Sequence, residues 1–216
     1  MNQDNPDNKY YKQERTEIAR LIIGQPKTIL EIGCASGYFK HNIPWDCDYR
    51  GVEPVHEAAC EARDNGITVY EGLYQDVADR IPDGMFDLIV CNDVIEHMAD
   101  PWLFLKGLKT KLAPEGCVIG SLPNVRYLLN LRDLVFRKDW PYADAGVLDR
   151  THLRFFTLKS ARRLFNECHY EIDVLRPSGP DRFNWLKKVI SPLFLFIGTD
   201  VLYMQMAFRL KSRERQ

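Results

Sequence analysis

The chain has 216 residues, with 29 lysines and arginines against 30 aspartates and glutamates, so its formal net charge is −1. This balance argues against a dedicated nucleic-acid binder, which usually carries a basic excess. With 11 Phe, 10 Tyr and 4 Trp, the chain has too much apolar surface to remain disordered. Its length favours a single domain.

None of the six cysteines belongs to a Cys-x-x-Cys pair, so a zinc ribbon or a thioredoxin-like motif has no support, and no metal site is predicted. Residues 1–9 are polar and are predicted to be a disordered tail rather than a signal peptide. No stretch reaches the roughly 18 apolar residues that a membrane span needs. The reducing cytoplasm is the expected location.

Helical and β-rich patterns then alternate along the chain. A first helix is predicted over residues 10–23, closed by Gly24 and Pro26. A later helix starts at Pro101, directly after a capping Asp100. The predicted strands are residues 28–32, 48–52, 67–70, 86–91, 117–122, 170–175 and 201–210, and the further helices are residues 55–65, 101–112 and 158–168.

This alternation predicts an α/β fold with a doubly wound, mostly parallel sheet and helices on both faces. The last strand is predicted to be antiparallel, and residues 10–216 are predicted to form one domain. Right-handed crossovers place the carboxyl ends of the parallel strands at one edge of the sheet, where ligands bind. Candidate site residues are therefore sought at those strand ends.

The most informative segment is residues 29–39, in which a strand runs into a turn of small residues and then a helix. Such a turn brings backbone amides close to a nucleotide-like ligand. It is not a dinucleotide fingerprint, because Glu31 stands where the first glycine would be. A carboxylate there suits a cationic ligand. Glu53 follows Gly33 by 20 positions, at a second strand end where an acid binds a ribose diol.

These residues resemble the class I S-adenosylmethionine-dependent methyltransferases from about residue 10 to residue 210. Glu31-x-Gly33-x-Ala35-x-Gly37 matches the first motif, with Ala35 in place of the usual middle glycine. Residues 49–54 resemble the second motif, and residues 86–97 resemble the fourth-strand motif with its Glu-His continuation. The resemblance implies a Rossmann-like fold, with S-adenosylmethionine as the cofactor and S-adenosylhomocysteine as the product.

The resemblance also implies a set of cofactor-binding residues at the strand ends. Many members have Gly-Asp after the third strand, but here the pair is Gly72-Leu73. Adenine would then rest on backbone groups near Leu73 and Tyr74, or on Asp76. The implied set is Glu31, Gly33, Cys34, Ala35, Gly37, Tyr38, Glu53, Pro54, Leu73, Tyr74, Asn92 and Asp93.

Residues 123–157 form a connection much longer than the ~2–6 residues typical of such links, and they are predicted to be a substrate-side insertion that roofs the site. Leu128, Leu131 and Leu134 at helical spacing predict a helix packing inward. The candidate substrate-binding residues are Asn124, Arg126, Tyr127, Asp149, Arg150 and Arg154. In the alternative interpretation, the arginines pair with Asp133, Asp144 and Asp149 and only fix the loop.

Residues 122–126 and 148–157 resemble a narrower subgroup, often found with glycosyltransferases and cell-surface polysaccharide assembly. This resemblance implies methylation of a sugar hydroxyl on a nucleotide-, lipid- or polymer-linked glycan. Two alternatives stay open. One is an O-methyltransferase of a small phenol or quinone precursor, and the other is a non-catalytic module that binds S-adenosylmethionine.

Two histidines are candidates for the base that removes the acceptor's proton. His97 directly follows the fourth strand, and His152 lies in the insertion, although each has a structural alternative. Residues 183–197 are predicted to form an amphipathic helix. It either packs on the sheet or provides a peripheral contact with the inner face of the membrane or with a second subunit of a homodimer.

Overall fold

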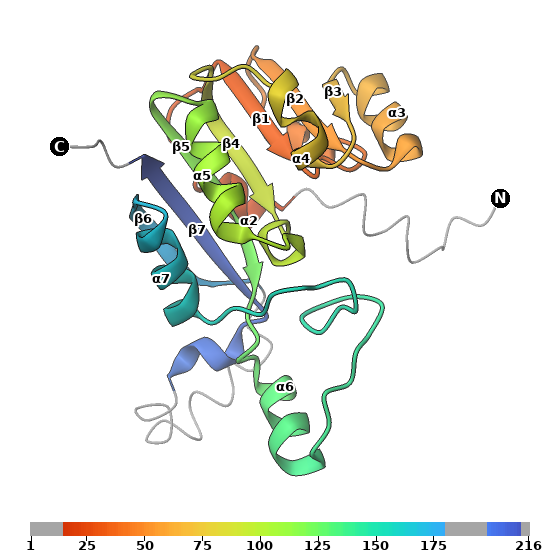
Figure 1. Cartoon of the computed structure of the whole chain (residues 1–216), viewed down its shortest axis with the longest axis vertical. Coiled ribbons are helices and arrows are strands. Elements are labelled where there is room, and N and C mark those ends of the chain that lie inside the picture. The colour runs from red at the N-terminus through yellow and green to blue at the C-terminus, as the bar shows by residue number, and fades with distance from the viewer. Residues whose placement is uncertain (1–14, 180–197, 213–216) are drawn as a thin grey trace.

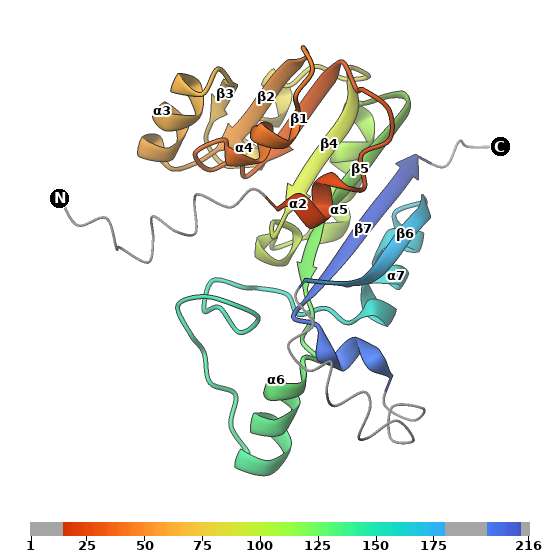
Figure 2. The ribbon, with the colours of Figure 1, turned by 180° about the vertical axis from the view of Figure 1, so that it is seen from behind.

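The computed structural model describes residues 15–179 and 198–212, so the predicted tail 1–9 and the predicted helix 183–197 lie outside the described residues. Seven strands form one sheet in the order β3-β2-β1-β4-β5-β7-β6 (Figures 1 and 2). The strands are β1 Thr28–Ile32, β2 Asp48–Glu53, β3 Thr68–Glu71, β4 Phe86–Asn92, β5 Leu112–Pro123, β6 Tyr170–Ser178 and β7 Gln205–Ser212.

The pairing confirms the predicted mostly parallel sheet. β1 pairs in parallel with β2 and β4, β2 pairs with β3, and β4 pairs with β5. β7 is antiparallel to both β5 and β6, as predicted for the last strand. This strand begins later than the predicted residue 201, because the 3₁₀ turn η5 Thr199–Leu202 occupies the first part of that segment.

The predicted helices 55–65, 101–112 and 158–168 are present as α3, α5 (Pro101–Lys111) and α7, whereas the described part of the predicted helix 10–23 holds only the short α2 (Thr16–Ala19). The Asp100 side chain accepts a hydrogen bond of 2.9 Å from the Leu103 N–H and caps α5, as predicted. The predicted helix after the glycine turn is instead the 3₁₀ helix η1. The helices are α2 Thr16–Ala19, α3 His56–Asp64, α4 Tyr74–Val77, α5 Pro101–Lys111, α6 Leu128–Arg132 and α7 Leu158–Glu167. The shorter turns are η1 Tyr38–Asn42, η2 Ala78–Arg80, η3 Ile95–His97 and the π-helical η4 Asp133–Arg137.

The sheet is buried on both faces. Successive strand residues point to opposite faces, so Leu30 and Ile89 join one core cluster with Phe104, whereas Ile29 and Leu88 join the other. Burial on both faces is the expected environment of a parallel sheet in an α/β protein. This packing fixes the carboxyl ends of β1, β2 and β4 along one edge.

The predicted helix of the insertion forms as α6, and its expected inward face is only partly buried. Leu128 and Leu131 are half-buried, whereas Leu134, in η4, is 46% exposed, and α6 projects away from the sheet (Figure 1). The insertion has a small buried cluster of its own, formed by Tyr127, Val147 and Leu148. In the described part of the chain, no helix is long and apolar enough to cross a bilayer.

Candidate functional site

The turn after β1 folds tightly against the end of β2. The N–H groups of Gly33 and Cys34 donate to the Val52 carbonyl at 2.8 and 3.1 Å. Gly33, Ala35 and Gly37 have φ angles of +69°, +46° and +81°, in the left-handed region that favours glycine. Ala35 adopts this conformation despite its side chain, at a cost of roughly 1 kcal/mol. The substitution of the usual glycine is therefore compatible with the turn.

Glu53, at the end of β2, accepts a hydrogen bond from this turn. Its Oε2 accepts from the Ala35 N–H and its Oε1 from the Val55 N–H, both at 2.9 Å. Burial raises the pKa of Glu53, and the two N–H groups oppose that rise. Each carboxylate oxygen has a further lone pair for a ligand. A bond from Glu53 to a ribose diol thus fits the geometry and stays a prediction.

Acceptor atoms gather at the ends of β1 and β4. The Tyr49 hydroxyl donates to Glu31 Oε2 at 2.8 Å, and burial raises the pKa of Glu31 to about 8. The Oδ1 atom of Asn92 is buried without a hydrogen-bond partner. A buried carboxyl group and an orphaned amide oxygen both gain from a cationic donor. The strand ends therefore fit a ligand that carries an ammonium group.

The other predicted cofactor contacts are divided between surface and core. Asp93 accepts from the Ser121 hydroxyl at 2.8 Å and forms an ion pair with Arg15. Leu73 is exposed at the start of α4, whereas the Tyr74 ring packs into the core. Tyr74 therefore offers a cofactor only its backbone. The remaining residues of the predicted set lie in or beside the turn: buried Cys34, Tyr38 in η1, and Pro54 after β2.

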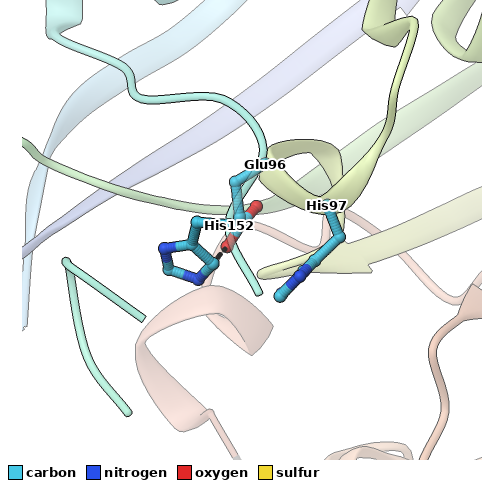
Figure 3. Close-up of side chains that lie close together, drawn as sticks. All are labelled: Glu96, His97 and His152. Carbon is cyan, nitrogen blue, oxygen red and sulfur yellow. Dashed lines mark ion pairs between the residues drawn. The ribbon is translucent and has the colours of Figure 1, made fainter. Parts of the chain in front are cut away.

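The two candidate histidines come together although 55 positions separate them in the sequence. Glu96 and His97 lie in η3 after β4, and His152 lies in the insertion, with Glu96 between the rings in the view of Figure 3. The ring centroids are 4.8 Å apart, and Nε2 of His152 is 3.9 Å from Oε1 of Glu96. We call Glu96, His97 and His152 the Glu-His-His cluster.

The insertion is attached to this cluster by its own backbone. Thr151 donates from its N–H and its hydroxyl to Asp149 Oδ1, at 2.8 and 2.6 Å, which closes a tight turn. The N–H groups of Leu153 and Arg154 then donate to the Glu96 carbonyl at 2.9 and 3.0 Å. Residues 148–157, which resemble the glycosyltransferase-associated subgroup, therefore hold His152 against η3.

Most of the Glu-His-His cluster is shielded from solvent. Glu96 is 1% exposed, neither of its carboxyl oxygens has a hydrogen-bond partner, and burial raises its pKa to about 8. The pKa of His97 is lowered mainly by burial, and the neighbouring His152 ring lowers it further. Glu96 is not among the site residues predicted from the sequence. The signal was its position between Ile95 and His97 in a turn that follows the buried strand β4.

His97 also lines a groove of about 790 Å³ between α4 and α5. The groove reaches the predicted adenine contacts Leu73 and Tyr74 at one side and Leu153 of the insertion at another. A larger cavity, of about 1000 Å³, lies near Gly116 at the other end of β5, away from the glycine turn. The groove beside His97 therefore reaches from one candidate base to the predicted adenine contacts.

The first three predicted substrate-binding residues support the insertion. Asn124 is fully buried, and its Nδ2 donates to the carbonyls of Asp200 and Tyr203 at 2.9 and 3.1 Å. Arg126 lies 3.5 Å from Asp200 Oδ2. Tyr127 is buried in the insertion's own cluster. These contacts join the insertion to η5, and a substrate role for the three residues stays a prediction.

The other three behave in a similar way. Asp149 closes the turn before His152. Arg150 pairs with Asp144 at 2.7 Å. Asp144 is one of the partners expected if the arginines only fix the loop. Arg154 donates to the Ala99 carbonyl at 2.5 Å. The arginines that were predicted to bind an anionic sugar thus have partners within the protein.

The model of a family described as a methyltransferase domain matches residues 7–174. The chain belongs to the methyltransferase domain family. The family implies S-adenosylmethionine as the cofactor, and its ammonium group fits the acceptors at Glu31 and Asn92. Glu53 would hold its ribose, and Gly33 to Gly37 would supply backbone amides.

Curated relatives match over part of the chain. The ubiquinone biosynthesis O-methyltransferase of Paraburkholderia phymatum is 28% identical over 104 residues, which are 45% of this chain and 45% of that protein. The protein of the same name from Azorhizobium caulinodans is 31% identical over 103 residues, 44% of this chain and 40% of the relative. The chain thus matches less than half the length of these relatives.

Solved structures share the fold. A SAM-dependent methyltransferase from Thermotoga maritima superposes with a TM-score of 0.63 at 18% identity, covering 94% of this chain and 89% of the other. One from Archaeoglobus fulgidus gives a TM-score of 0.65 at 15% identity, covering 95% and 97%. These likenesses confirm the Rossmann-like architecture.

Proposed function

We propose that the protein is an S-adenosylmethionine-dependent O-methyltransferase whose acceptor is a phenolic hydroxyl on an aromatic compound of the quinone-precursor type. The observation that carries this proposal is the Glu-His-His cluster at the end of β4, where His97 opens onto the groove. Methyl transfer to an alcohol or phenol needs a site for the departing proton. The cluster supplies such a site next to the predicted cofactor contacts.

The groove favours an aromatic acceptor over a sugar. Its walls include Met98, Leu103, Phe104 and Leu153. Behind His152, the Phe155 ring lies 6.4 Å from the imidazole, centroid to centroid, and packs edge-on against Trp140. Apolar and aromatic walls bind a planar ring better than a polyol. The curated relatives are named ubiquinone biosynthesis O-methyltransferase, and this name supports the same acceptor class.

A glycan acceptor is the second candidate. It is favoured by the exposed Tyr142 ring and by the arginines of the insertion, which suit a polyhydroxylated, anionic substrate. However, Arg126, Arg150 and Arg154 already have protein partners. A sugar phosphate would have to replace those partners, so we place this function second.

The reaction divides the work between two parts of the chain. S-adenosylmethionine, when bound, supplies a methyl group on a positively charged sulfur. Glu31, Asn92 and Glu53 bind and orient it, and the groove holds the acceptor ring. His97 would accept the proton that the acceptor hydroxyl loses when its oxygen receives the methyl group that the cofactor would supply. The products are the methyl ether, S-adenosylhomocysteine and a proton.

The test is a transfer assay with methyl-labelled S-adenosylmethionine. Two acceptor panels are compared at equal concentration: catechols and hydroxylated quinone precursors, and nucleotide sugars with polysaccharide fragments. Labelled methyl ethers in the aromatic panel alone support the proposal. Transfer to the sugar panel with none to the phenols would overturn it in favour of the glycan. Cofactor binding with no transfer to either panel would favour a non-catalytic module.

A further inference from the structure

Both histidines of the Glu-His-His cluster are held in the same tautomer. His97 Nδ1 lies 3.2 Å from the Thr151 carbonyl, and His152 Nδ1 lies 3.1 Å from the Val147 carbonyl. A carbonyl oxygen only accepts hydrogen bonds, so each Nδ1 carries a hydrogen. Each Nε2 therefore presents a lone pair. A backbone carbonyl on the far ring nitrogen is the usual support of a histidine that ligates a metal.

The Glu96 carboxyl group between them has no hydrogen-bond partner among the described residues. Both of its oxygens are buried. The 3.9 Å from Oε1 to Nε2 of His152 is too long for a hydrogen bond. One ligand atom from each of the three residues lies within 4.8 Å of the other two. Bonds of about 2.0–2.2 Å to one ion would need these atoms roughly 3–4 Å apart, a small side-chain adjustment.

We propose that Glu96, His97 and His152 bind one divalent transition-metal ion. Two imidazoles and one carboxylate suit Zn²⁺, Fe²⁺, Mn²⁺ or Co²⁺, whereas Mg²⁺ and Ca²⁺ prefer oxygen ligands alone. His97 lines the groove, so an ion held by these three residues would lie beside the space assigned to the acceptor. This proposal departs from the expectation from the sequence that there is no metal site.

The ion's role in the reaction rests on the proposed function. A metal at these three residues would polarise the acceptor hydroxyl and ease loss of its proton without taking the proton on a ligating nitrogen. The released proton would pass to solvent through the groove. His97 would then act as a ligand rather than as the base.

A second histidine–carboxylate pair in the chain provides a matched contrast. His56 Nδ1 lies 2.7 Å from Glu71 Oε1, but both side chains are solvent-accessible, and Arg63 satisfies the other Glu71 oxygen at 2.7 Å. That carboxylate has its partners, and its histidine faces water. The pair is an ordinary surface ion pair. His56→Gln is therefore the control for loss of a histidine beside a carboxylate.

The experiment titrates the full chain, prepared without a histidine tag, with Co²⁺ alone and follows the visible d–d absorption. Zn²⁺ then competes for the site. We expect one Co²⁺ per chain, displaced by Zn²⁺, and affinity at least about tenfold weaker in Glu96→Gln, His97→Gln and His152→Gln. His56→Gln should bind as the wild type does. Circular dichroism verifies that each variant is folded, and Glu96→Gln keeps the shape of the side chain.

Two outcomes would overturn the metal proposal. One is no stoichiometric Co²⁺ binding by the folded wild type. The other is binding that the three cluster substitutions leave unchanged or that His56→Gln weakens equally. Because the titration contains neither cofactor nor acceptor, it is independent of the proposed function. Methyl transfer to phenols that is insensitive to chelators would reject the metal alone, and metal binding without phenol turnover would reject the acceptor class alone.

Discussion

At the ends of β1, β2 and β4, polar side chains point acceptor atoms toward one edge of the sheet, and several of those atoms are unsatisfied or only partly used. In the insertion between β5 and α7, the polar side chains that were predicted to bind substrate bond instead to other parts of the protein. Glu31 and Asn92 represent the first region, and Asn124 and Arg126 represent the second. The difference indicates that ligand recognition depends on acceptors that the fold leaves available.

The Glu-His-His cluster lies where the two regions meet. Glu96 and His97 come from the sheet, and His152 comes from the insertion. Under the proposed function, the bonds of the insertion hold in place the third side chain of a site that the sheet alone leaves incomplete. Substitutions in the two regions should therefore affect different steps.

The largest effect is expected from His97→Ala. If the acceptor's proton leaves at the cluster, kcat should fall by about 10²–10⁴-fold. The affinity for S-adenosylhomocysteine should stay the same, because His97 lies in η3 and is not one of the predicted cofactor-binding residues. Steady-state kinetics and calorimetry measure the two quantities, with His56→Ala as the control. A fall of less than about fivefold, or an equal loss of cofactor affinity, would contradict the assignment.

Glu53→Ala should weaken cofactor binding by roughly 2–4 kcal/mol, since it removes a charged hydrogen-bond acceptor for the ribose and releases the glycine turn. The matched control is Glu71→Ala. Glu71 pairs with Glu53 in the β2–β3 register and also ends its strand, but it binds His56 and Arg63 instead. Calorimetry that shows equal losses in the two variants, or NAD binding in the wild type, would contradict this role.

The sheet and its glycine turn could be predicted because local signals decide them. The run of residues 28–32 predicts β1 with its observed bounds, and Asp100 before Pro101 fixes the start of α5. These features depend on neighbouring residues and on hydrophobic periodicity. The placement of Glu53 at a strand end follows from the same alternation.

The insertion could not be predicted to the same depth, because long-range contacts decide it. Nothing near Arg126 in the sequence shows that Asp200 lies opposite, and the leucine spacing of α6 is the same for a buried and an exposed helix. The meeting of His152 with Glu96 depends on two backbone hydrogen bonds across more than 50 positions. Only the fold makes these pairs visible.

Cofactor binding should depend on pH through Glu31. Burial raises its pKa to about 8 in the folded protein from the usual 4.5, so the folded chain holds the extra proton between those values. A cationic cofactor prefers the ionised carboxylate, so affinity should rise by up to about tenfold per pH unit and level off above about pH 8. Calorimetry from pH 6 to pH 9 measures this slope.

Glu31→Gln is the control for that slope and should bind with a flat pH profile. The buried ionised carboxylate reduces stability as the pH rises from 4.5 toward 8, so the variant should also be more stable than the wild type at pH 8, by on the order of 1–3 kcal/mol. An equal slope in both proteins would assign the titration to another group.

Asp149→Ala addresses the junction of the two regions. It removes the acceptor for both Thr151 bonds and so loosens the turn that carries His152. We expect kcat to fall about tenfold and the free energy of unfolding to fall by about 1–2 kcal/mol, with cofactor affinity unchanged. Asp144→Ala, in the same loop, breaks only a surface pair with Arg150 and is the control. Similar kinetics in the two variants would contradict the positioning role.

The smallest effect is expected from Arg126→Ala. The sequence predicted that this residue meets an anionic acceptor, so its loss would raise KM for the acceptor. In the structure, its guanidinium lies 3.5 Å from Asp200 Oδ2 in a partly exposed pair, which is worth about 0.2–1 kcal/mol. We therefore expect a small loss of stability and a KM within about threefold of the wild type. A double-mutant cycle with Asp200→Asn measures the pair, because the two losses should not add. If KM instead rises tenfold or more while stability is unchanged, Arg126 leaves Asp200 for the substrate, and an anionic glycan becomes the better acceptor.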